Sequence, residues 1–126
     1  MTEAIIGVDA GSSSVKVVAY AINGKVLCKS YQPVEMMVAK PGWAELDLSS
    51  YWEATARGLR EVSACVGRVR GVGLSTTAPT TVLFDEALRP LRPGITYLDN
   101  RAHRELETVA AQFTGGKEYF ELVGNR

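Results

Sequence analysis

Two apolar runs flank one short turn near the start of the chain, and this arrangement restricts the fold more than any other feature. The first run, Ala4–Val8, ends on Asp9 and then on a turn of small residues, Gly11–Ser14. The second run, Val15–Ile22, follows at once and closes at Asn23-Gly24, a dipeptide typical of a type I′ hairpin turn because both central positions need φ > 0. The sequence therefore predicts paired strands with an acidic side chain at their junction.

The next segments predict a strand–helix–strand crossover. Val15–Ile22 is apolar on both alternating faces, with Lys16 the main exception, which predicts a strand covered on both sides near the middle of a sheet. Lys25–Tyr31 is predicted to return beside it. A helix is predicted over about 48–66, because apolar residues recur there at helical spacing: Tyr51, Thr55, Leu59, Val62 and Val66. Arg68–Ser75 then predicts a short buried strand.

The helix cap and the later segments are less sharply marked. Either Asp47 or Ser50 can cap the helix, and Ser50 with Glu53 matches a capping box. The segment 36–47 contains Pro41-Gly42 and is predicted to be a loop. We then expect a strand over Thr80–Phe84, a turn over Asp85–Ala87 and an extended segment over Leu91–Leu98. A helix over Asn100–Phe113 and a last short helical turn over Glu118–Val123 should follow.

This order of elements predicts an α/β fold. Three hairpin-linked strands, a crossover helix and further strands are the opening order of a ribonuclease-H-like, actin-like domain with a mixed sheet and flanking helices. A sheet of this type needs at least one more strand and helix. We therefore expect residues 1–126 to be the amino-terminal portion of an incomplete first domain, with a second domain absent.

Composition excludes several classes of function. The 14 basic and 14 acidic residues cancel, which argues against a broad nucleic-acid footprint. Cys28 and Cys65 form no metal-spaced pair, so free thiols in a reducing compartment are expected. The first residues lack the basic and apolar regions of a signal peptide, and no window approaches the roughly 18 apolar residues of a membrane span. We expect a cytoplasmic protein that binds neither nucleic acid nor membrane.

The turn after the first apolar run is a candidate phosphate and metal site. Backbone N–H groups of Gly11, Ser12, Ser13 and Ser14 can converge on an anion, and the hydroxyls add donors. Mg²⁺ prefers one or two carboxylates plus phosphate oxygens, so a metal would turn the repulsion between Asp9 and phosphate into attraction. Lys16 can neutralise the same phosphates. The alternative is that Asp9 caps a turn that the serines merely fill. Neither GxxxxGK(S/T) nor GxGxxG occurs in the chain.

Four ordered stretches carry a family resemblance. They are Ile6–Lys16, Pro41–Asp47 with Tyr51–Ala54, Val72–Ser75 through Val82–Asp85, and Leu91–Ala102. These stretches resemble the motifs of the FGGY carbohydrate kinases, which include xylulokinases, gluconokinases and glycerol kinases. The resemblance implies ATP-dependent phosphorylation of a sugar or polyol hydroxyl, in a cleft between two actin-like domains. On this model Asp9 organises Mg²⁺, while the Gly11–Ser14 turn and Lys16 face the ATP phosphates.

The resemblance also indicates substrate-binding residues. The segment with Thr77, Ala78 and Pro79 would line the sugar pocket, although a hairpin stiffened by proline explains it equally well. Glycerol kinases carry Arg-Glu and xylulokinases Met-His where this chain has Ala78-Pro79, which cannot hydrogen-bond a hydroxyl through their side chains. The identity of the sugar is therefore not carried over. Asp99 and Arg101 either approach the substrate or form a structural pair in the pocket wall.

Several functional groups of the family are not among these 126 residues. No catalytic residue is assigned here, because the general base, the second phosphate motif and the adenosine motif are expected beyond Arg126. We therefore expect the chain alone to be inactive. The rival interpretations are a non-catalytic module that binds a carbohydrate or a partner, and another actin-like ATPase. An unpaired sheet edge would also allow two copies to associate as a homodimer.

Overall fold

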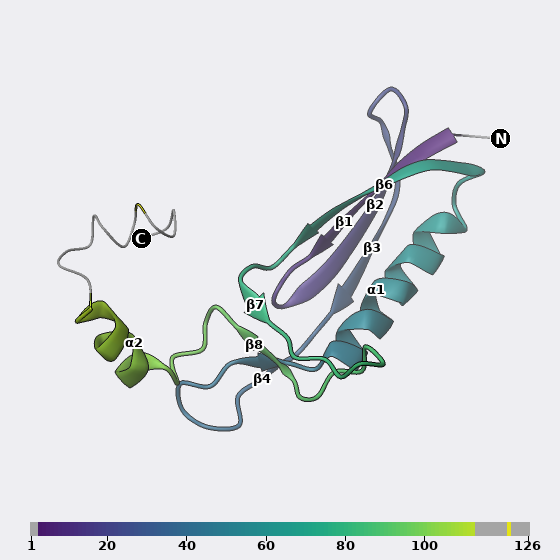
Figure 1. The fold of residues 1–126 in the computed structure, drawn as a ribbon. Coiled ribbons are helices and arrows are strands. Elements are labelled where there is room, and N and C mark those ends of the chain that lie inside the picture. The colour runs from purple at the N-terminus through teal and green to yellow at the C-terminus, as the bar shows by residue number, and fades with distance from the viewer. Residues whose placement is uncertain (1–2, 113–120, 122–126) are drawn as a thin grey trace.

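The computed structural model describes residues 3–112 and 121, and its longer strands form a four-stranded mixed sheet (Figure 1). In their order across the sheet, the strands are β3 (Val26–Pro33), β2 (Ser14–Ala21), β1 (Glu3–Ala10) and β6 (Arg68–Thr76). The pairs β1–β2 and β2–β3 are antiparallel, whereas β1 and β6 run parallel. The predicted hairpin-linked strands and parallel crossover are confirmed.

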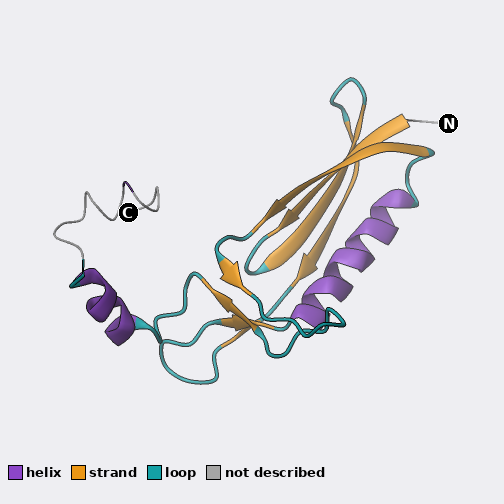
Figure 2. Cartoon of the chain, viewed as in Figure 1, coloured by secondary structure: helices purple, strands orange, loops and turns teal. Residues whose placement is uncertain are grey.

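The crossover helix α1 (Leu48–Ser63) directly precedes β6 in the chain and lies over β2 and β3 on one face of the sheet (Figure 2). Asp47 caps it by accepting a hydrogen bond from the Ser49 amide at 3.1 Å, and the Ser50 hydroxyl also donates to Asp47, at 2.7 Å. Of the two candidate caps, Asp47 and Ser50, the structure therefore has Asp47. The helix ends at Ser63 and not at the predicted residue 66. The amides of Cys65 and Val66 donate to carbonyl groups three residues earlier, and not four as in an α-helix.

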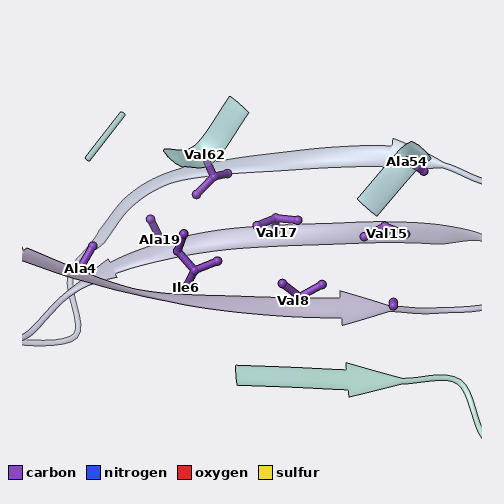
Figure 3. Packing of buried hydrophobic residues seen from close by; sticks show 9 residues of the cluster. Ala4, Ile6, Val8, Val15, Val17, Ala19, Ala54 and Val62 are labelled. Carbon is purple, nitrogen blue, oxygen red and sulfur yellow. The ribbon is translucent and has the colours of Figure 1, made fainter. Parts of the chain in front are cut away.

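The hydrophobic core lies between α1 and the sheet (Figure 3). Alternate residues of β1 and β2 meet small residues of the helix there: Ala4, Ile6, Val8, Val15, Val17 and Ala19 from the strands, and Ala54 and Val62 from α1. The most deeply buried helical stripe is Ala54, Gly58 and Val62, with Tyr51 and Leu59 only partly buried beside it. The absence of side-chain bulk at Ala54 and Gly58 lets the helix approach the sheet closely.

The opposite face of the sheet is open. Lys16 and Tyr20 on β2 are exposed, so the prediction that this strand is covered on both sides is wrong for the described residues. The prediction of a buried strand over 68–75 is also wrong, since Val72 and Leu74 of β6 are 59% and 68% exposed. The reason is geometric: α1 lies over β2 and β3, so within the described chain it leaves β6 at an uncovered edge.

The turn between β2 and β3 differs from the predicted type I′ turn. Gly24 has φ +85°, but Asn23 lacks the positive φ that a type I′ turn requires at both central positions. The Gly24 amide donates to the Ala21 carbonyl at 2.8 Å, and the Ala21 amide donates to the Lys25 carbonyl at 2.8 Å. These bonds define a type I turn followed by a left-handed glycine, the common three-residue hairpin loop.

A second, smaller sheet is built from short strands in the order β4 (Met36–Met37), β5 (Glu45–Leu46), β8 (Gly94–Thr96) and β7 (Thr80–Thr81). The segment predicted as a loop therefore contains two short strands, and the later predicted strands are shorter than expected. Helix α2 (His103–Ala110) lies within the predicted helix and projects away from both sheets (Figure 1). Apart from Glu121, the helical turn predicted over Glu118–Val123 lies outside the described residues. In the described part, no helix is long and apolar enough to cross a membrane.

Candidate functional site

An acidic and a basic side chain face each other where β1 ends and β2 begins. Asp9 and Lys16 are register partners, and Lys16 Nζ lies 3.5 Å from Asp9 Oδ2. Both side chains are on the open face and more than half exposed, at 55% and 54%. An exposed pair of this kind contributes at most about 1 kcal/mol to folding, so a ligand can separate the two charges at little cost.

The turn that follows Asp9 is held to its surroundings through its carbonyl oxygens. The Ala10 carbonyl accepts from the Thr77 amide at 2.9 Å, and the Ser13 carbonyl accepts from the Val34 amide at 3.1 Å. The Gly11 amide donates to the Ser14 carbonyl at 2.9 Å, so one of the predicted phosphate donors is already engaged. The turn is tight there, since a Cβ on Gly11 would lie 3.3 Å from the Ser14 carbonyl oxygen.

The exposure of the turn residues divides them into two groups. Ser13 is exposed and Gly11 and Ser12 are half-buried, whereas Ser14 is only 4% exposed. The first three can therefore meet a ligand from solvent. Ser14 instead starts β2 as part of the buried framework.

Tyr51 of α1 supports the same turn from the covered side of the sheet. Its hydroxyl donates to the Ala10 carbonyl and lies 3.1 Å from the Gly11 carbonyl. Burial, together with the negative charge of Asp9, raises the pKa of the Tyr51 hydroxyl, which therefore remains a donor at neutral pH. Sequence reasoning missed this role, because an aromatic residue at helical spacing indicates only a core position.

A hollow of about 530 Å³ opens on the uncovered face of the sheet beside Asp9 and Lys16. Gly7 and Gly73 lie opposite each other in the parallel pairing of β1 and β6, and Ser75 lies opposite Asp9. The two glycines carry no side chains, so at these two positions the hollow is lined by backbone. Its lining consists of Gly7, Val8, Asp9, Lys16, Val18, Tyr20, Gly73, Leu74 and Ser75.

The structure places the predicted substrate segment beside the turn. Thr77 follows β6 directly, is half-buried, and bonds to the Ala10 carbonyl through its amide. Ala78 and Pro79 are exposed and are joined by a cis peptide bond. Because the side chains of Ala78 and Pro79 have no polar atoms, these two residues can hydrogen-bond only through their backbone.

Asp99 and Arg101 belong to a separate ionic cluster in the smaller sheet. Arg101 Nε donates to Asp99 Oδ1 at 2.8 Å, and its Nη2 lies 2.6 Å from both Asp99 Oδ2 and Glu45 Oε1. The Ala44 amide donates to Asp99 Oδ2 at 2.7 Å, and Arg92 donates to Glu45. Both oxygens of Asp99 are thus used by protein donors, and none of these residues is among those that line the hollow.

The cluster is charged and largely buried. The Asp99 side chain is 2% exposed, and hydrogen bonds from Arg101 and from the Ala44 amide lower its pKa. Hydrogen bonding to Arg101 also lowers the pKa of Glu45 and outweighs the effect of burial. The guanidinium of Arg101 lies 3.8 Å from the centre of the Trp43 ring, a cation–π contact. The cluster ties the 40–47 segment to the start of the 99–110 segment.

Asp9 is the candidate metal ligand at the hollow. No group of three or more His, Cys, Asp and Glu side chains within the described residues is arranged to hold a metal ion. Asp9 offers one half-exposed carboxylate beside an open hollow, which suits a cation that also takes phosphate and water oxygens as ligands.

The fold and these motifs define an actin-like domain of the carbohydrate-kinase type. Residues 4–124 match the model of the FGGY family of carbohydrate kinases, N-terminal domain. The chain belongs to this family, and the predicted family and α/β, ribonuclease-H-like fold are confirmed.

Relatives and solved structures agree with this assignment. The chain is 32% identical over 120 residues to a glycerol kinase of Aquifex aeolicus, covering 93% of this chain and 24% of the relative. It is 26% identical to a xylulose kinase of Klebsiella pneumoniae, covering 95% of this chain and 25% of the relative. The crystal structure of a xylulose kinase from Rhodospirillum rubrum superposes with a TM-score of 0.87 at 26% identity, over 93% of this chain and 25% of that one. The chain thus spans about a quarter of the length of these relatives.

Proposed function

We propose that this chain supplies the amino-terminal part of an ATP-dependent kinase that phosphorylates a hydroxyl of a sugar or polyol. Membership of the FGGY family supports the reaction class. The observation that carries the proposal is the half-exposed Asp9–Lys16 pair, which stands over the hollow beside the Gly11–Ser14 turn. ATP as the phosphoryl donor is supported by a structure of Plasmodium falciparum glycerol kinase with ADP, which shares this fold at a TM-score of 0.75.

The residues of the site match the needs of phosphoryl transfer, which depends mainly on positioning and charge neutralisation. Asp9 would hold Mg²⁺, which supplies positive charge to the nucleotide phosphates when it is bound. Lys16 would neutralise phosphate oxygens directly. Ser12 is half-buried and Ser13 is exposed, and both would donate hydrogen bonds to phosphate from amide or hydroxyl groups.

The substrate side of the site is proposed to involve Thr77, Ala78 and Pro79 through their backbone. Thr77 is the best placed of the three, since its amide is bonded to the residue that follows Asp9. Asp99 and Arg101 are proposed to shape the pocket wall and not to touch the sugar, because their polar groups are engaged with each other and with Glu45. The general base that removes the hydroxyl proton is proposed to come from beyond Arg126.

Two assays test the proposal. The 126-residue chain with Mg·ATP and a panel of sugars should release no sugar-dependent ADP, because the general base and the rest of the phosphate site are proposed to lie outside it. In a kinase that contains this chain as its amino-terminal part, Asp9→Asn should lower kcat by about 100-fold or more and change the sugar KM much less.

Glu86→Gln is the matched control for the second assay, since it neutralises an exposed carboxylate that does not line the hollow. A wild-type kcat for Asp9→Asn would reject the metal role of Asp9. Sugar-dependent ADP release by the isolated chain, lost in Asp9→Ala, would show that the chain carries more of the site than proposed.

A further inference from the structure

Two cysteines that are far apart in the sequence meet where β3 lies against the end of α1. The Cys28 thiol on β3 donates to the Val62 carbonyl, with a sulfur–oxygen distance of 3.5 Å. The Cys65 amide donates to the same carbonyl oxygen at 3.1 Å. The distance from Cys28 Sγ to the Cys65 amide nitrogen is therefore at most the sum of these two distances.

The two thiols have different surroundings. Cys65 lies in the turn after α1 and is exposed, whereas Cys28 is half-buried in the layer between β3 and the helix. Burial raises the pKa of the Cys28 thiol to about 11, and the neighbouring Cys65 thiol adds to the rise. The Cys65 thiol donates to the Glu61 carbonyl, with a sulfur–oxygen distance of 3.4 Å, so the two thiols bind neighbouring carbonyl groups in the last turn of α1.

We infer that Cys28 and Cys65 form a dithiol modification site that a low-molecular-weight disulfide oxidises to an intramolecular disulfide. The site lies on the layer of β3 and α1 and uses none of the residues that line the hollow. The inference is therefore independent of the proposed kinase activity. The resulting bond would join β3 covalently to the end of the crossover helix.

The exchange proceeds in two balanced steps. The exposed Cys65 loses its proton and attacks one sulfur of oxidised glutathione; the S–S bond breaks and one reduced glutathione leaves with that proton. Cys28 then loses its proton and attacks the Cys65 sulfur of the mixed disulfide, which releases the second reduced glutathione. Two protein thiols are oxidised, and one glutathione disulfide is reduced to two thiols.

The test measures the effective concentration of one thiol at the other. The whole 126-residue chain is equilibrated with mixtures of reduced and oxidised glutathione, quenched with acid and N-ethylmaleimide, and analysed by intact mass and peptide mapping. We expect a Cys28–Cys65 crosslink. The effective concentration of one thiol at the other should be at least about tenfold higher in buffer than in urea, where the thiols meet only through random motion of the unfolded chain. By linkage, the oxidised chain must then unfold at a higher urea concentration than the reduced chain.

Single-cysteine variants provide the controls. Cys28→Ser should accumulate a glutathione adduct on the exposed Cys65, and Cys65→Ser should form its adduct on Cys28 more slowly. Because Cys65 is exposed, Cys65→Ser should leave the fold intact. It therefore provides the control even if Cys28→Ser disturbs the fold. Separate glutathione adducts on both cysteines of the native chain without a crosslink would overturn the inference. An effective concentration no higher in buffer than in urea would also overturn it.

Discussion

Replacing Gly58 with alanine tests how closely α1 lies on the sheet. A Cβ at this position would lie 2.7 Å from Val17 Cγ2. Carbon atoms in contact prefer about 3.5–4.0 Å, so the new methyl would be about 1 Å too close. Val17 is fully buried on β2 and is β-branched, and its side chain therefore has little freedom to turn away.

The expected magnitude follows from two opposing terms. Overpacking a core costs about 1–3 kcal/mol, while glycine to alanine in a helix contributes about 1 kcal/mol of stability. We expect Gly58→Ala to lower the free energy of unfolding by about 1 kcal/mol. At an exposed helical glycine the same substitution would be stabilising.

Urea unfolding followed by far-ultraviolet circular dichroism measures this change, and Val17→Ala provides the matched background. Val17→Ala alone should cost about 2 kcal/mol through lost burial and a cavity. In that background the methyl group introduced at position 58 has room, so Gly58→Ala should become stabilising by up to about 1 kcal/mol. An identical effect of Gly58→Ala in both backgrounds would refute the close contact with Val17.

Two further predictions concern the turn and the ionic cluster. Tyr51→Phe removes the hydroxyl that donates to the Ala10 carbonyl and should cost about 1 kcal/mol of unfolding free energy in the same urea assay; an unchanged midpoint would contradict the contact. The lowered pKa of Asp99 means that the unfolded chain binds its proton first, so stability is present above the ordinary carboxyl pKa of about 4 and declines as the pH falls below it. Asp99→Asn should destabilise the chain at pH 7 and flatten the decline between about pH 4 and 2; an equally steep decline would show that other carboxylates cause it.

Features that depend on neighbouring residues were predicted well. Two apolar runs and the Asn23-Gly24 turn located β1, β2 and β3, and helical spacing located most of α1. Asp9 and Lys16 were correctly placed at the junction of two strands, because the apolar runs on either side leave only a short turn between them. Local patterns did not distinguish Asp47 from Ser50 as the cap, since both residue types fit that position equally well.

Features that depend on contacts between distant segments were missed. Nothing near Tyr51 in the sequence indicates that its hydroxyl reaches the turn after β1, and the spacing of Cys28 and Cys65 gives no sign that both bind the Val62 carbonyl. The apolar residues of β6 were predicted to be buried because hydrophobicity does not reveal which strands a helix covers. The sequence left two interpretations of Asp99 open, because it does not show that Arg101 and the Ala44 amide donate to the oxygens of that carboxylate.

The sequence by itself therefore determined the order of strands and helix, the acidic turn and the family, because periodicity, turn chemistry and ordered motifs are written in consecutive residues. The tertiary structure alone decided which face of the sheet is covered, which side chains meet across layers, and that the Asp9 hollow and the Asp99 cluster are separate. These properties depend on the direction and depth of helix packing. They are set by long-range contacts such as that of Gly58 with Val17.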